Sequence, residues 1–184
     1  MLTTNSKLAK DNIYSFNLPA GETCPFAGDC KKFCYAQKGR YNFGVVINRA
    51  VKNYQESKGK FFGIKIAVEA DIRRAKIIRI HSSGDFYNKR YANKWVKIAI
   101  NNPGILFYAY TKSWEYFKYK LPSNLILIES VGGKKPIHLN KPHAKIFKSK
   151  AELRKAGYLD CSKSDLKAVK AVQAGVKKLG LIYH

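Results

Sequence analysis

The chain has 184 residues, 46% of them hydrophobic, which is enough to bury one substantial core but not two independent ones, so we expect a single domain over residues 1–184. The 35 Lys and Arg against 12 Asp and Glu give a formal net charge of +23. This charge predicts attraction to nucleic acid or, alternatively, only a solvated lysine-rich surface. No apolar run suits a membrane span and residues 1–10 lack a secretory signal, so we expect an intracellular protein with reduced cysteines.

The first elements in chain order are a strand, a loop that contains cysteines, and two helices. Residues 13–18 alternate apolar and polar side chains and run into a Pro-Ala-Gly segment, which predicts a strand followed by a loop. Residues 45–57 place apolar side chains near helical spacing before a Lys-Gly pair, and predict a helix. Residues 61–76 fit a helix or a strand, and their charged positions favour the helix.

Strands and helices alternate over the rest of the chain. Residues 77–86 begin as a β-branched strand and end in a polar, glycine-containing turn. The later segments predict helices at 91–101, 114–118, 150–157 and 164–178 and strands at 105–110, 125–130, 144–147 and 179–183. The strand at 125–130 is nearly continuously apolar, as expected for a parallel strand covered on both faces. Six strands that alternate with helices predict βα units and a parallel sheet.

Six strands are too few for a closed eight-stranded barrel, so the α/β fold that we expect is an open, partial βα barrel. Ligands bind such sheets at the carboxyl ends of the strands. The polar residues at the predicted strand ends are His81, Ser83, Gly84, Asp85, Thr111, Lys112 and Glu129. They predict a pocket. The alternative for Ser83, Gly84 and Asp85 is an ordinary Asx-capped turn, the alternative for His81 is a hydrogen-bonded core residue, and Lys112 and Glu129 could instead form surface ion pairs. His184, which follows the last predicted strand, could reach the same edge.

Three of the four cysteines lie in one loop after the first predicted strand. Cys24, Cys30 and Cys34 have the spacing C-x5-C-x3-C, with a proline and a glycine between the first two, so the backbone can curl and bring the thiols together. Soft thiolates select iron–sulfur clusters or zinc, and we expect a 4Fe-4S cluster with structural zinc as the alternative. Cys161 is the candidate fourth ligand. Without it, one iron stays open to an amino-acid-like ligand.

The cysteine loop and the turn at Ser83, Gly84 and Asp85 resemble the radical S-adenosylmethionine superfamily. In that superfamily a loop after the first barrel strand carries three cluster cysteines, and the second strand ends in a motif that contacts the methionine amino group. The resemblance implies a radical-SAM-like fold and S-adenosylmethionine as a small-molecule cofactor, contacted by Ser83, Gly84 and Asp85. Thr111, at the end of the next strand, offers a hydroxyl to the same ligand. The cysteine spacing differs from the C-x3-C-x2-C pattern common there.

A closer resemblance is to the phage-encoded gene product 88 family. It is carried by C-P-F-A-G-x-C-x-x-x-C-Y-A, G-R-Y-x-F, R-I-H-x-S-G-D-F and F-Y-A-Y-T-K-S, in that order. It implies a phage protein that acts in the host cytoplasm. Two functions follow from the sequence. One is a cluster-dependent enzyme of radical S-adenosylmethionine type whose unknown substrate could be nucleic acid. The other is a non-enzymatic, basic nucleic-acid-binding protein whose zinc or iron–sulfur site holds a loop in place.

Overall fold

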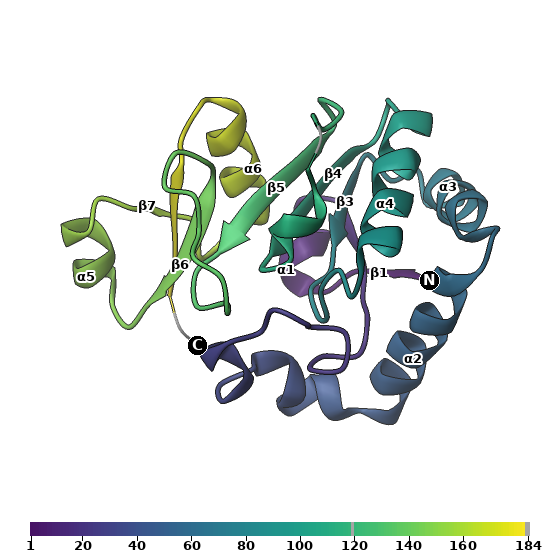
Figure 1. The fold of residues 1–184 in the computed structure, drawn as a ribbon, viewed down its shortest axis with the longest axis horizontal. Helices are drawn as coiled ribbons and strands as arrows, with labels where there is room; N and C mark the ends of the chain where they lie inside the picture. The colour runs from purple at the N-terminus through teal and green to yellow at the C-terminus, as the bar shows by residue number, and fades with distance from the viewer. Residues whose placement is uncertain (119, 183–184) are drawn as a thin grey trace.

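The computed structural model describes residues 1–118 and 120–182, which form one eight-stranded sheet with helices on both faces (Figure 1). The strands are β1 Leu2–Thr3, β2 Ile13–Phe16, β3 Ile77–Ile80, β4 Leu106–Thr111, β5 Leu125–Ser130, β6 His143–Phe147, β7 Leu159–Asp160 and β8 Lys178–Ile182. The helices are α1 Ser6–Ala9, α2 Gly44–Lys58, α3 Phe62–Ile72, α4 Lys89–Asn101, α5 Lys150–Lys155 and α6 Asp165–Gln173, with short 3-10 turns η1 Asp29–Lys31, η2 Tyr35–Gln37, η3 Gly39–Asn42 and η4 Trp114–Tyr116.

The strand order is β1-β2-β3-β4-β5-β6-β8-β7. Strand β1 runs antiparallel to β2, and every other neighbouring pair is parallel. The α/β class and the parallel sheet are therefore confirmed. The sheet is open, with β1 and β7 at its two ends. None of the helices in residues 1–118 and 120–182 has the length and apolar character needed to cross a membrane.

The expected number of six strands was wrong. Strands β1 and β7 have two residues each, which is too short for alternation of side chains to be recognised in the sequence. The last predicted helix, 164–178, ends at Gln173. Gly175 has φ +86°, and the amides of Gly175 and Val176 bond back to Val172 and Ala171, as in a Schellman cap. Tyr183 and His184 lie outside the described residues.

Two apolar layers flank the sheet because strand side chains alternate between its faces. On one face Trp95 of α4 is fully buried between Phe16 of β2 and Phe107 of β4, at ring-centroid distances of 5.5 and 6.1 Å. On the other face Val169 of α6 packs with Tyr108 of β4 in a cluster that also includes Leu8 of α1. Helices α3 and α4 thus cover one side of the sheet and α1 and α6 the other.

Candidate functional site

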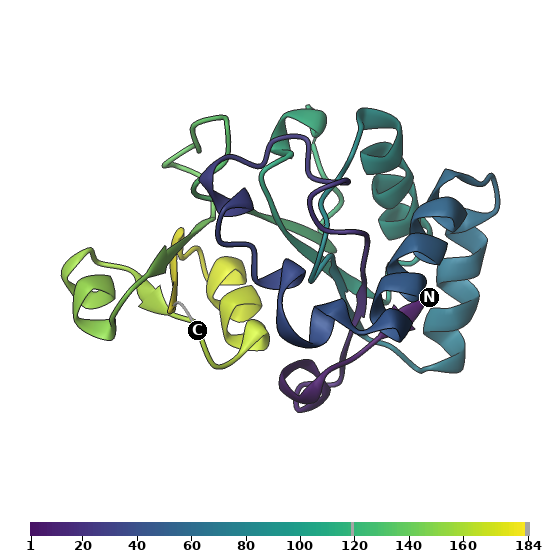
Figure 2. The same cartoon turned by 90° about the horizontal axis from the view of Figure 1, so that it is seen from below.

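The segment between β2 and α2 lies across the carboxyl ends of the parallel strands, as the view from below shows (Figure 2). Its helical elements are the short turns η1, η2 and η3, and the rest of the segment is irregular. The Leu18 amide donates to the Ser83 carbonyl at 3.0 Å, which holds the start of this segment against the turn after β3. The Lys134 amide donates to the Phe26 carbonyl at 2.9 Å. The cysteine loop is therefore fixed to the ends of the strands.

Cys24, Cys30 and Cys34 are free thiols, each partly exposed. The pKa of Cys24 is raised to about 11: burial is the largest cause, a hydrogen bond with the Gly21 backbone lowers it, and the charges of Asp85, Cys34 and Cys30 add to the increase. Across the part of the chain that the structure describes, however, no three Cys, His, Asp or Glu side chains are arranged to hold a metal ion. Thiolates are suitable ligands for a cluster, but in this conformation the described part of the loop does not place three ligands around one metal position.

Cys161 has a different environment from the loop cysteines. Its side chain is buried, 1% exposed, in an apolar cluster with Ile128 of β5 and Ala168 of α6. Its amide donates to the Gly180 carbonyl at 2.9 Å, and burial raises the pKa of its thiol. These are the surroundings of an inert, structural cysteine.

Asp85 is buried, and its carboxylate is used inside the fold. Oδ1 accepts from the Thr111 hydroxyl at 2.6 Å and from the Phe86 amide at 2.8 Å, and Oδ2 accepts from the Lys112 amide at 2.9 Å. Thr111 in turn accepts from the Ser113 amide at 2.8 Å. Burial raises the pKa of Asp85, and these donors only partly offset that effect. Asp85 and Thr111 therefore connect the ends of β3 and β4. Both carboxylate oxygens of Asp85 already accept hydrogen bonds in this connection.

Gly84 occupies a position that only glycine fits. Its φ is +80°, and a Cβ added there would lie 2.6 Å from both the Leu18 Cβ and the Thr23 Oγ1. Beside it the Ser83 hydroxyl donates to the Leu18 carbonyl at 2.8 Å. The turn thus has a structural reason for its Ser-Gly-Asp sequence, since it lets the cysteine loop approach the sheet closely.

The substitution Gly84→Ala is expected to lower the free energy of unfolding by about 2–4 kcal/mol, because the new methyl group adds backbone strain and a clash at the same position. Urea unfolding measures the change. Gly104→Ala is the matched control, since nothing lies within 4 Å of a Cβ at that position. We expect the control to shift stability by less than about 0.5 kcal/mol. Equal midpoints for the two variants would contradict the packing argument.

His81 lies in the core under α4. It is 3% exposed, its Nε2 lies 2.8 Å from the Tyr91 hydroxyl, and its ring packs edge-on against Phe86 at 4.8 Å. Burial, and then the charge of Arg79, lowers the pKa of His81 to about 3, so the imidazole is neutral at physiological pH. His81 is therefore positioned by core packing, next to the turn rather than on the cysteine loop.

Glu129 and Lys112 also make contacts within the fold. Glu129 is 3% exposed, accepts from the His138 amide at 2.7 Å, and lies 2.9 Å from the Nδ1 of the same histidine. It fixes the loop that follows β5. Lys112 is partly exposed, and its side-chain stem faces Gly133 of that loop. Both residues lie at the predicted edge, because Thr111 and Glu129 are register partners.

A buried charged cluster that was not expected from the sequence lies on the α6 face of the sheet. Asp165 at the start of α6 accepts from Arg79 at 2.7 Å, from Lys7 at 2.7 Å and from the Tyr108 hydroxyl at 2.9 Å. The one signal for it in the sequence was an arginine among the isoleucines of β3. Tyr35 connects the cysteine loop to the turn after β3: the residue is 53% exposed, while its hydroxyl donates to the Ser82 carbonyl.

A pocket of about 280 Å³ lies between the cysteine loop and the first turns of α2. Its walls include Tyr41, Ile47 and Ala50, and Gln37 and Ser83 supply polar groups. Of the residues predicted for the site, only Ser83 lines this pocket. Its other walls come from the end of the first predicted strand, the cysteine loop and the predicted helix α2, which the sequence did not indicate would enclose a pocket.

Comparison with known proteins identifies the family. A family model described as gene product 88 matches residues 1–181. The chain belongs to the gene product 88 family. The gene 88 protein of Mycobacterium phage L5 is 30% identical over 112 residues, which cover 53% of this chain and 47% of that protein. The chain therefore spans about half the length of this curated relative. No solved structure matches. The resemblance to the gene product 88 family is confirmed, whereas the comparisons lend no support to a radical S-adenosylmethionine relationship.

Proposed function

We propose that this gene product 88 protein binds an iron–sulfur cluster through Cys24, Cys30 and Cys34. The observation that carries the proposal is the position of three free, partly exposed thiols on one loop across the carboxyl ends of the parallel strands. Thiolates are the ligands that iron–sulfur clusters require. The loop contains only short 3-10 turns, so it can close around a cluster without breaking a long element.

Cys161 supports an open rather than a closed cluster. Its thiol packs in the core beneath α6, and moving it to the loop would expose that apolar cluster. A cluster with three protein ligands has one iron free to bind the amino and carboxylate groups of a small molecule. The parallel strands β2 to β6, followed by β8, form an open sheet, and ligands bind such sheets at the carboxyl ends of the strands. S-adenosylmethionine is our candidate ligand.

The residues around the loop have supporting roles in this proposal. Tyr35 and Ser83 hold the cysteine loop against the turn after β3 through their contacts with the Ser82 and Leu18 carbonyls. Asp85, whose hydrogen bonds join β3 to β4, fixes that turn in place. The pocket beside Ser83 offers space for a small molecule against residues of the cysteine loop. The reduced cytoplasm of a phage-infected host would keep the thiols available for metal.

Iron, sulfide and zinc should be measured in anaerobically purified protein, followed by electron paramagnetic resonance of the reduced protein with and without S-adenosylmethionine. We expect stoichiometric iron and sulfide and a cluster signal that shifts when the cofactor is added. An unshifted signal would retain the cluster and remove the cofactor from the proposal. Protein without iron and sulfide after reconstitution would contradict the cluster itself.

A second function is favoured by the net charge of +23. In this alternative the protein binds nucleic acid without catalysis, and a zinc or iron–sulfur site only fixes the loop. Stoichiometric zinc in the purified protein, together with nucleic-acid affinity that falls steeply with salt, would support it. Affinity that changes little with salt would count against it, because phosphate contacts release counterions.

A further inference from the structure

The cysteine loop and the start of α2 carry a long run of uncompensated positive charge. Between Asp29 and Glu56 the chain has no acidic residue. The basic residues of this interval, all exposed, are Lys31, Lys32, Lys38, Arg40, Arg49 and Lys52. Lys32 lies 3.7 Å from Asp29, but an exposed pair at this distance does little to neutralise it. This part of the surface therefore attracts anions.

Aromatic side chains are interleaved with these cations. Phe33 and Phe43 are each 61% exposed, so neither side chain is buried in the hydrophobic core. Large apolar rings held in water on one short segment indicate a surface that contacts a partner. We call Lys31, Lys32, Phe33, Lys38, Arg40 and Phe43 the aromatic–basic surface.

The pocket of about 280 Å³ lies beside this surface and is built from the same segment. Tyr41 and Ile47 provide apolar walls, while the amides of Gln37 and Asn42 provide donors and acceptors. A planar heterocycle with hydrogen-bonding edges matches such a lining. The pocket and the aromatic–basic surface therefore offer the three contacts that a nucleotide needs: a slot for a base, rings for stacking, and cations for phosphate.

We propose that the aromatic–basic surface binds single-stranded nucleic acid, with phosphates on its lysines and arginine, bases stacked on Phe33 and Phe43, and one base in the pocket. Exposed rings can stack only on bases that are not already paired, which favours a single strand over a duplex. A second copy of the chain is disfavoured, because two such surfaces would bring like charges together. This inference adds a nucleic-acid partner to the function proposed above. It rests on that function only for the presence of an iron–sulfur cluster in the same loop.

Fluorescence anisotropy tests the stacking contacts. The probe is a short, fluorescein-labelled mixed-sequence oligonucleotide, as DNA and as RNA. Phe33→Ala and Phe43→Ala are each expected to weaken binding by roughly 5- to 150-fold, the range found when a base-stacking aromatic is removed. Phe61→Ala is the matched control, since Phe61 is 54% exposed but lies just before α3, outside the surface. We expect that variant to bind like the wild type.

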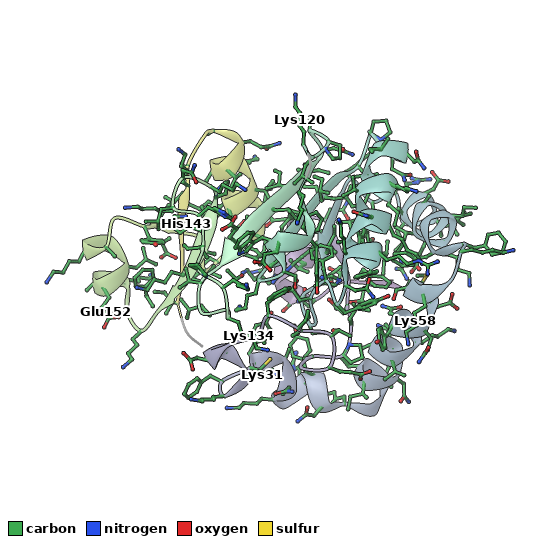
Figure 3. The ribbon with its side chains drawn as sticks, in the orientation of Figure 1. Lys31, Lys58, Lys120, Lys134, His143 and Glu152 are labelled. Carbon is green, nitrogen blue, oxygen red and sulfur yellow. The ribbon has the colours of Figure 1, made fainter. Side chains whose placement is uncertain are left out.

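The dependence of affinity on salt tests the phosphate contacts. Each phosphate contact on a single strand contributes about −0.7 to the slope of log K against log salt. The double variant Lys31→Gln with Lys32→Gln is expected to make that slope shallower by about 1.4. Lys76→Gln with Lys120→Gln is the control, because both lysines are exposed and precede β3 and β5, at the opposite ends of these strands from the cysteine loop. Figure 3 shows Lys120 far from Lys31. The slope of this control should equal that of the wild type.

Several results would overturn the proposal. Unchanged affinity in both Phe33→Ala and Phe43→Ala would do so, as would equal affinity for a duplex of the same sequence. Sedimentation that showed these variants losing self-association, with oligonucleotide affinity intact, would assign the surface to a second copy. Iron content is measured on each sample. If the wild type binds the oligonucleotide through these residues but takes up no iron, only the proposed cluster is refuted. If the protein has its full iron content but the phenylalanine substitutions leave affinity unchanged, only the present inference is refuted.

Discussion

Single substitutions Cys24→Ser, Cys30→Ser and Cys34→Ser are each expected to remove most of the iron and sulfide from the reconstituted protein. In the proposed site each thiolate is one of only three protein ligands, and a serine hydroxyl is a poor replacement for a soft thiolate at iron.

Cys161→Ala is the control for these variants. Because Cys161 lies in the core cluster under α6, the substitution is expected to lower the free energy of unfolding by about 1 kcal/mol and to leave the iron content unchanged. Metal analysis and electron paramagnetic resonance are the measurements, with circular dichroism to establish that each variant is folded. Loss of iron in Cys161→Ala, or retention of iron in all three loop variants, would show that the ligands have been assigned to the wrong cysteines.

The substitution Asp165→Ala is expected to lower the free energy of unfolding by about 3–5 kcal/mol, the cost of leaving a buried charge without its partner. Asp165 is 3% exposed on its side chain and accepts from Arg79 and Lys7, each at 2.7 Å. Lys7 is 38% exposed and can turn to water, but Arg79 is only 15% exposed and would remain uncompensated. Chemical unfolding measures the loss. Asp29→Ala, at an exposed pair, is the control and should unfold with the wild type.

The contribution of Asp165 to the free energy of unfolding should decrease as the pH falls. Burial alone would raise the pKa of this carboxyl, but Arg79 and Lys7 more than offset burial and hold its pKa below the ordinary value. The unfolded chain then binds the proton more tightly, so the stabilisation is fully present above the unfolded pKa of about 3.9 and is lost as the pH falls through the folded pKa. The stability difference between wild type and Asp165→Ala should therefore shrink in acid. A difference that grew in acid would contradict the ion-pair assignment.

Local patterns in the sequence determined the alternation of strands and helices and the position of the cysteine loop. Helix α4 and strand β5 formed at their predicted positions within a few residues, because the spacing of their apolar side chains is a property of neighbouring residues. The parallel sheet followed from the same alternation, and it brought the strand-end residues to the edge where the cysteine loop lies. Two-residue strands carry no such pattern, and β1 and β7 were missed for that reason.

The roles of the polar residues were decided by the tertiary structure. Sequence position offered Asp85 as a ligand contact, but its hydrogen bonds run to Thr111 at the end of β4 and to Lys112 just after it, 26 and 27 residues away. Arg79 and Asp165 are 86 residues apart, and only the packing of α6 on the sheet joins them. A contact between distant segments depends on how whole elements pack, and no short stretch of sequence contains that information. The sequence by itself therefore located the edge of the sheet where a site would lie, and the packed structure determined which side chains there are already engaged.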